Sequence, residues 1–209
     1  LNAVDAFFHD AMTGFIFSRG TADVSSSVWV YGVLVPGAVT AAFLATGPYA
    51  SEGAGWRATL IVAESAAVSA AVVQGLKFTA ARKRPFVRYG TGETSGVYDV
   101  NKPDSIFSLP SGHTALAASL GFATAMTASL QESPAAPWLW GGAALGIVTT
   151  ASLRMMAEKH YFTDVAAGAL IGAASGTIFP LLHRRGGALS TPLVSVGAQG
   201  PAFAVSGVF

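Results

Sequence analysis

Long intervals without a charged residue constrain this chain more than any other feature of its sequence. Asp, Glu, Lys and Arg are absent between Asp23 and Glu52, Asp104 and Glu132, Glu132 and Arg154, and Asp164 and Arg184. Apolar stretches of this length predict long helices that are buried in a tightly packed bundle or cross a membrane. Only 11% of the residues are charged, against about 25% in a typical soluble domain, and this apolar content rules out a disordered chain.

These intervals predict helices at 26–48, 113–130, 137–154 and 163–184. A further apolar helix is expected at 56–82, although Glu64 lies within it. Residues 3–17, within an N-terminal segment at 1–20, have apolar side chains at roughly helical spacing and predict a short amphipathic helix. The predicted fold class is all-α, a compact bundle of about six helices in one domain over residues 1–209.

Two stretches interrupt the helical pattern. Residues 86–110 are rich in Gly, Thr, Ser, Asp and Pro, and long connections of this kind often carry function. The tail at 186–209 contains Gly and Pro between loosely alternating segments. We expect a short C-terminal β-hairpin there, turning around Gln199-Gly200-Pro201.

The apolar content is dominated by small residues, 39 Ala and 24 Gly. Small residues let helices approach closely in membranes and in soluble bundles, and Ala gives a weak membrane signal. A soluble or peripheral domain outside the cytoplasm is therefore slightly favoured, with an integral inner-membrane domain and an outward-facing site as the alternative. The start at Leu1 in place of Met favours a processed, periplasmic form.

Charge and cysteine content exclude several classes of function. A net charge of +1 argues against a nucleic-acid partner bound by general phosphate neutralisation. The absence of Cys excludes disulfides, thiolate catalysis and Cys-based metal sites.

The basic residues gather at the end of the helix expected at 56–82. Five of the twelve lie within twelve positions: Lys77, Arg82, Lys83, Arg84 and Arg88. Such a cluster is either a solvated helix end or an anion site, because Arg presents a planar fork and Lys a point charge to phosphate oxygens.

A second polar cluster, Leu109-Pro110-Ser111-Gly112-His113-Thr114, opens the next helix. Backbone N–H groups at a helix start readily bind an anion, and His113 would stand beside it in the first turn. The alternative is simple capping of the helix by Ser111.

The third cluster runs from Arg154 to Asp164 and contains His160 four residues before the Asp. A carboxylate on one imidazole nitrogen fixes the tautomer and leaves the other nitrogen free to attack. A structural hydrogen bond, or capping by Asp164, is the alternative. Together the three clusters supply what phosphoryl transfer needs: cations, backbone N–H groups, a nucleophile and a proton donor.

The three clusters resemble the signature of the type 2 phosphatidic acid phosphatase and vanadium haloperoxidase superfamily. Lys77-x6-Arg84-Pro85, Pro110-Ser111-Gly112-His113 and Arg154-x5-His160-x3-Asp164 follow in the family's order over residues 77–164. One position departs: the family usually has Ser directly before the Arg, whereas Leu153 stands there and Ser152 lies one residue earlier.

The resemblance implies a metal-independent phosphatase that works through a phosphohistidine. His160 would be the nucleophile and Asp164 would orient it, while His113 would protonate the leaving alkoxide and then activate water. The residues implied to hold the phosphoryl group are Lys77, Arg84, Ser111, Gly112 through its backbone N–H, and Arg154. No cofactor is implied, although vanadate would bind as a phosphate mimic.

The implied substrate is a lipid or isoprenoid phosphate or a small soluble phosphate ester. A vanadate-dependent haloperoxidase is an alternative, and so is a non-catalytic envelope bundle. Arg82, Lys83 and Arg88 match no motif position and are expected to be solvated, and His9 and His183 are expected to be incidental.

Overall fold

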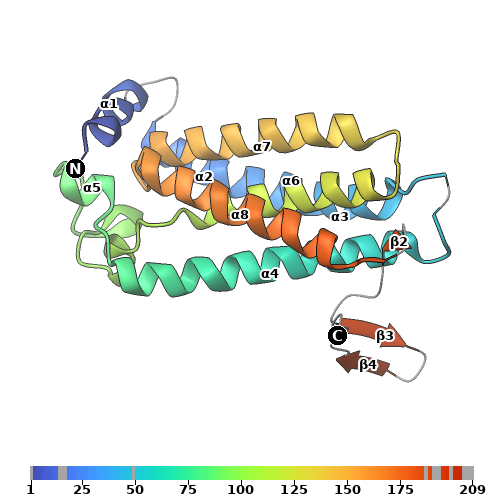
Figure 1. The fold of residues 1–209 in the computed structure, drawn as a ribbon. Coiled ribbons are helices and arrows are strands. Elements are labelled where there is room, and N and C mark those ends of the chain that lie inside the picture. The colour runs from blue at the N-terminus through green and yellow to red at the C-terminus, as the bar shows by residue number, and fades with distance from the viewer. Residues whose placement is uncertain are drawn as a thin grey trace.

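A computed structural model of the chain describes residues 2–13, 18–48, 50–185, 188–189, 194–197 and 200–203. It is a bundle of long helices that lie roughly side by side (Figure 1), so the predicted all-α class is confirmed. Its helices are α1 (Ala3–Met12), α2 (Arg19–Ser27), the π-helix η1 (Val28–Leu34), α3 (Val35–Leu44), α4 (Ala54–Ala80), α5 (Pro85–Arg88), the 3-10 helices η2 (Gly96–Tyr98) and η3 (Pro103–Ile106), α6 (Gly112–Leu130), α7 (Ala136–Met156) and α8 (Phe162–Leu182).

Short strands follow the last helix. β1 (Arg184–Arg185) pairs antiparallel with β2 (Ala188–Leu189), and β3 (Val194–Gly197) pairs antiparallel with β4 (Gly200–Phe203). Gln199, expected in the hairpin turn, and residues 204–209 lie outside the described residues.

The first long helix differs from its predicted bounds. α2, η1 and α3 form one continuous rod that begins at Arg19 and ends at Leu44, whereas 26–48 was predicted. Ser18 caps the rod by accepting a hydrogen bond from the backbone N–H of Thr21, so the helix begins before the uncharged interval does. α1 ends at Met12, and residues 14–17 of its predicted range lie outside the described residues.

Three glycines bring α8 against α6, the helix that it contacts most extensively. They recur every fourth residue and therefore lie along one side of α8: Gly168, Gly172 and Gly176. A Cβ on each would approach the backbone oxygens of Ser111, Ala115 and Ser119 to 2.4, 2.2 and 2.7 Å. Only glycine therefore permits this distance between the two helix axes.

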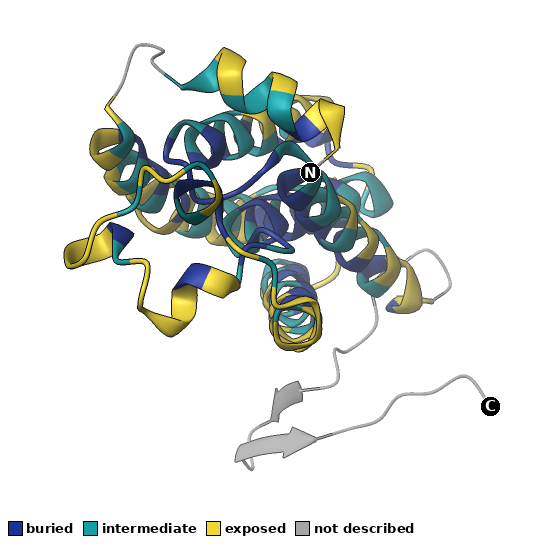
Figure 2. Cartoon of the chain, turned by 90° about the vertical axis from the view of Figure 1, so that its left-hand side faces the viewer, coloured by how far each residue is buried: buried dark blue, intermediate teal, exposed yellow. Residues whose placement is uncertain are grey.

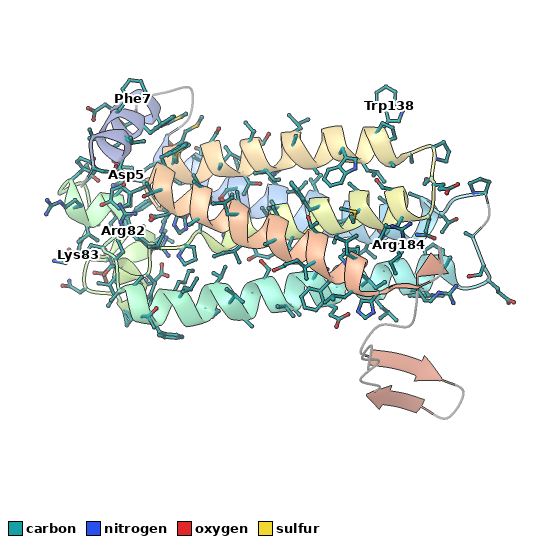
Figure 3. The ribbon with its side chains drawn as sticks, in the orientation of Figure 1. Asp5, Phe7, Arg82, Lys83, Trp138 and Arg184 are labelled. Atoms are coloured by element: carbon teal, nitrogen blue, oxygen red, sulfur yellow. The ribbon has the colours of Figure 1, made fainter. Side chains whose placement is uncertain are left out.

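The outer surface of the bundle is strongly apolar. Seen from one end, exposed residues lie around the bundle and buried residues lie between the helices (Figure 2). Large exposed side chains include Trp138, which points away from the bundle in Figure 3, Val148 on the same helix, and Leu170 on α8. Three helical segments are long and apolar enough to cross a membrane, Arg19–Leu44, Ala54–Arg88 and Phe162–Leu182, which is compatible with membrane association.

His183, expected to be incidental, ties two helices together at their remote end. It follows α8 directly, and its Nε2 atom lies 2.9 Å from Oε2 of Glu64 on α4. This hydrogen-bond partner also helps to accommodate Glu64 in an apolar helix.

The α6–α8 contact predicts a difference between two glycine-to-alanine substitutions. Gly172→Ala should lower the free energy of unfolding by about 1–3 kcal/mol, because the added methyl group overpacks the contact. Gly141→Ala on α7 is the matched control, because a Cβ there meets nothing within 4 Å. Thermal unfolding of both variants in the same detergent measures the difference, and equal stabilities would contradict the packing described.

Candidate active site

The three polar clusters meet at one end of the bundle. The segment after α4, the segment before α6 and the segment between α7 and α8 are joined there by backbone hydrogen bonds. Ser108 N–H donates to the carbonyl of Arg82, and Ser111 N–H donates to the carbonyl of Asp164, each over 2.9 Å. The fold therefore brings the three clusters together, although the first of their residues, Lys77, and the last, Asp164, are 87 positions apart in the sequence.

His160 lies in the segment between α7 and α8 and is 3% exposed. Its Nδ1 atom is 2.6 Å from the backbone oxygen of Ser108. A carbonyl oxygen only accepts, so Nδ1 carries the proton and Nε2 keeps its lone pair. This tautomer is the one that a nucleophilic imidazole requires.

Asp164 lies in the first turn of α8, on the Nδ1 side of the His160 ring. Its Oδ2 atom is 3.9 Å from Nδ1 of His160, which is too far for a hydrogen bond. Oδ2 instead accepts from the Ser108 hydroxyl and, over 2.9 Å, from the backbone N–H of Tyr161. Asp164 therefore contacts the residue whose carbonyl holds His160, and the role predicted for it stays a prediction.

The pKa of the His160 imidazole is lowered well below the ordinary value of 6.5. Burial is the largest cause, followed by the positive charges of Arg84, Arg154 and Lys77, while the hydrogen bond to Ser108 acts in the opposite sense. The imidazole is consequently neutral at neutral and mildly acidic pH.

Arg154, in the last turn of α7, is 4% exposed. Its Nη1 atom donates to Oδ1 of Asp23 over 2.7 Å and to the hydroxyl of Ser26 over 2.9 Å. The Nε–H group is shielded from solvent and has no partner. A buried donor without an acceptor is costly, so this atom is ready to bind an anion.

Arg84 and Lys77 supply the other two cations. Arg84 lies four residues after the end of α4. It donates to the carbonyl of Lys159 over 3.1 Å and to Oδ1 of Asp104 over 2.7 Å. The Nζ atom of Lys77 lies 3.7 Å from the position of a Cβ on Gly112, which places it over the start of α6. The first N–H groups of α6 lack an intrahelical acceptor and add to the positive potential.

His113 faces the first rod from the first turn of α6. Its Nε2 atom is 3.3 Å from the hydroxyl of Ser27, and its ring forms a T-shaped contact with the ring of Tyr31, with centroids 5.4 Å apart. Ser111 caps α6, with its hydroxyl 3.0 Å from that of Thr114. Capping by Ser111 is therefore realised, and its predicted contact with phosphate stays a prediction.

The expectation of a solvated side chain is wrong for Arg82. It donates to Thr163 and Asp164 through Nη1 and to Asp5 through Nη2. Lys83 and Arg88 are exposed, as expected. His9 is not incidental either, since its Nε2 atom is 3.1 Å from Oε1 of Glu158, two residues before His160.

Several residues of the site could not be recognised from the sequence. Asp23 holds Arg154 and lies 3.7 Å from Nζ of Lys159, although it had been placed outside the predicted helix at 26–48. Ser26 and Ser27 reach the site from the same rod. The available signal was that Asp23 is the charged residue directly before the first uncharged interval.

The arrangement combines a neutral, buried imidazole with three cations and a second histidine. Such a set can bind a phosphoryl group, attack it and deliver a proton. Within the described part of the chain, no group of three or more His, Cys, Asp or Glu residues is placed to hold a metal ion.

A comparison with protein-family models agrees with this site. The model described as the PAP2 superfamily matches residues 58–187, a range that contains all three clusters. Neither the search of curated proteins nor the search of solved structures gave a match. Because the family model covers more than half of the sequence, this chain belongs to the PAP2 superfamily.

Proposed function

We propose that this protein is a metal-independent phosphatase that hydrolyses a lipid phosphate monoester through a phosphohistidine on His160. The observation that carries the proposal is the hydrogen bond from Nδ1 of His160 to the Ser108 carbonyl, 2.6 Å long. It keeps the Nε2 lone pair available inside a ring of positive charge. Membership of the PAP2 superfamily supports phosphatase activity.

The proposed reaction has two displacements at phosphorus. Nε2 of His160 forms a P–N bond as the ester P–O bond breaks, and His113 gives a proton to the departing alkoxide. Burial and the nearby charge of Arg154 lower the pKa of His113 to about 3, so the proposal requires the anionic phosphoryl group to bring His113 into its protonated form when it binds. Neutral His113 then takes a proton from water, whose oxygen forms a new P–O bond as the P–N bond breaks. The products are an alcohol and inorganic phosphate, and both histidines return to their starting states.

Three cations would stabilise the charge on the phosphoryl oxygens. Lys77 lies beside the start of α6, the charge of Arg84 acts on the His160 imidazole, and Arg154 has the unpartnered, buried Nε–H group. A phosphoryl oxygen that accepts from Arg154 would satisfy this donor, so the donor needs no rearrangement to make this contact. These fixed charges provide the stabilisation for which other phosphatases use metal ions.

An apolar groove favours a lipid phosphate over a small soluble ester. A cavity of about 300 Å³ is bounded by η1, α3 and α7, and its floor is the α6 face that contains Ala117, Gly121 and Thr124. Ala117, Gly121 and Thr124 follow His113 at intervals of four, four and three residues. They therefore lie on the same side of α6 as His113. A hydrocarbon chain attached to a phosphate at His113 would lie along this floor.

The apolar outer surface supports an integral membrane location. The three helical segments that could cross a membrane present Tyr31, Phe78 and Leu170 to the surroundings. Exposed side chains of this kind are stable in hydrocarbon and costly in water. The polar site at one end of the bundle would then lie at a membrane surface, which we take to be the outer one.

Replacing the nucleophile tests the central step. His160→Ala should reduce phosphate release from phosphatidate in detergent micelles by at least about 10³-fold, since no other group on the chain takes over the attack. The assay contains EDTA, and the wild-type rate should not change when EDTA is added. Thermal unfolding of the variant verifies that it is folded, and full activity in a folded His160→Ala protein would refute the mechanism.

The pKa of His160 predicts the acid side of the pH profile. A nucleophilic imidazole must be neutral, and its pKa is lowered well below 6.5. Attack by His160 should therefore not be lost as the pH falls through 6.5, and protonation of this imidazole should stop it only at more acidic pH. Rapid-quench measurement of the phosphoenzyme between about pH 4 and pH 8 tests this. Loss of the phosphoenzyme centred near pH 6.5 would contradict the prediction.

Two neighbouring glycines of α7 test the groove. Gly142 lines it and Gly141 does not, and a Cβ on either residue meets nothing within 4 Å. Gly142→Phe should raise KM for long-chain phosphatidate about tenfold or more, by occupying space that a hydrocarbon chain needs. Its KM for p-nitrophenyl phosphate should not change, and Gly141→Phe should change neither value. Equal effects of both variants on phosphatidate would argue against the groove as the chain-binding site.

A further inference from the structure

Arg82 joins two carboxylates that are both closed off from solvent. Its Nη1 atom donates to Oδ1 of Asp164, and its Nη2 atom donates to Oδ2 of Asp5 over 2.7 Å. The side chains of Asp5 and Asp164 are each 0% exposed, whereas that of Arg82 is 26% exposed. Figure 3 shows Asp5 and Arg82 at the same end of the bundle, with Lys83 pointing outward beside them.

The conformation of the chain after α4 directs Arg82 inward. Ala81, the cap residue that follows α4, adopts the left-handed conformation with φ of 41°, and this turns the chain at the residue before Arg82. The guanidinium group lies over the ring of Tyr161 at 4.1 Å, which adds a cation–π contact. The position of this side chain is therefore set by contacts on several sides.

The contacts continue from Arg82 to the nucleophile. Asp164 accepts from Arg82 on one oxygen and from the Ser108 hydroxyl on the other. The backbone carbonyl of Ser108 then accepts from Nδ1 of His160. Arg82 also acts on Ser108 directly, because the Arg82 carbonyl accepts from the Ser108 N–H over 2.9 Å.

Asp5 contacts Arg82 from α1, a helix that carries none of the three clusters. It lies on α1 and accepts from the backbone N–H of Thr163 over 3.0 Å and from the Thr163 hydroxyl over 2.9 Å. Phe8 of the same helix stacks on Phe162 with ring centroids 4.1 Å apart. α1 lies outside the residues that the family model matches, 58–187.

We propose that Arg82 and Asp5 are positioning residues for His160, acting through Asp164 and Ser108, and that α1 therefore completes the active site. Asp5 fixes one arm of the guanidinium group, so that the other arm fixes Asp164. Asp164 then holds the Ser108 segment whose carbonyl sets the orientation and tautomer of the imidazole. This inference rests on the proposed role of His160 as the nucleophile.

Removal of Arg82 alone would leave two buried carboxylates without a cation, so loss of stability must be separated from loss of positioning. Four variants achieve this: Arg82→Gln, Arg82→Lys, Asp5→Asn and the double variant Arg82→Gln/Asp5→Asn. In the double variant one buried charge disappears together with its partner, which should restore much of the stability lost in Arg82→Gln. Lys83→Gln and Asp10→Asn are matched controls, since Lys83 directly follows Arg82, Asp10 lies on the same helix as Asp5, and both control residues are exposed.

Kinetics on phosphatidate provide the first readout. Arg82→Gln should lower kcat by about 10²-fold, with a much smaller change in KM, because a displaced nucleophile slows the attack and leaves binding largely intact. Asp5→Asn should lower kcat less, and Arg82→Lys should recover part of the loss. The double variant should stay slow although it is stable. Recovery of kcat together with stability in the double variant would show that Arg82 is only structural and would overturn the proposal.

A titration of the His160 imidazole by NMR provides the second readout and needs no turnover. The charges around His160 are those of Asp164, Arg84, Arg154 and Lys77. In the double variant Asp164 loses the Arg82 cation, so its carboxylate favours the imidazolium form and the His160 pKa should rise relative to the wild type. An unchanged pKa would overturn the positioning role. If wild-type protein released no phosphate, the proposed function would fail, while the titration would still decide whether Arg82 acts on His160.

Discussion

The close contact between α6 and α8 is the constraint on which the rest of the structure depends. It begins at Gly168, where a Cβ would lie 2.4 Å from the backbone oxygen of Ser111. Ser111 caps the helix that carries His113, and Gly168 lies one turn after Asp164. The distance between these two helices therefore also sets the distance between the two halves of the site. A larger side chain in this contact would move catalytic groups apart as well as loosen the bundle.

Charge is concentrated at one end of an otherwise apolar bundle, and there it is arranged in pairs. Arg154 meets Asp23, Arg84 meets Asp104, and Arg82 meets Asp5 and Asp164. Each pair is anchored on a different helix or connection, so burial of the charges and assembly of the bundle depend on one another. Lys77 takes no part in these ion pairs, which leaves its charge available for an anion.

The sequence predicted what is encoded locally. Uncharged intervals located α6, α7 and α8 within two residues at each end, because apolar length is a property of one segment. The clusters around Arg84, His113 and His160 were also recognised, since each is contiguous. Asp5 and Arg82 were missed because their importance comes from a pairing across 77 positions, and no spacing within either segment encodes it. Asp23 was missed because the predicted helix started at the uncharged interval, whereas a serine cap starts it earlier.

The position of Asp5 also determines when the site can form during synthesis. Its partner Thr163 follows it by 158 positions. The helices from α2 to α7 must therefore leave the ribosome before α1 can make its final contacts. Until then the Asp5 carboxylate lacks its partner Arg82, and burial of an unpaired carboxylate is costly. The catalytic centre is thus completed by a residue made well before the three clusters, and an ordered nucleophile appears only after α1 and the start of α8 have come together.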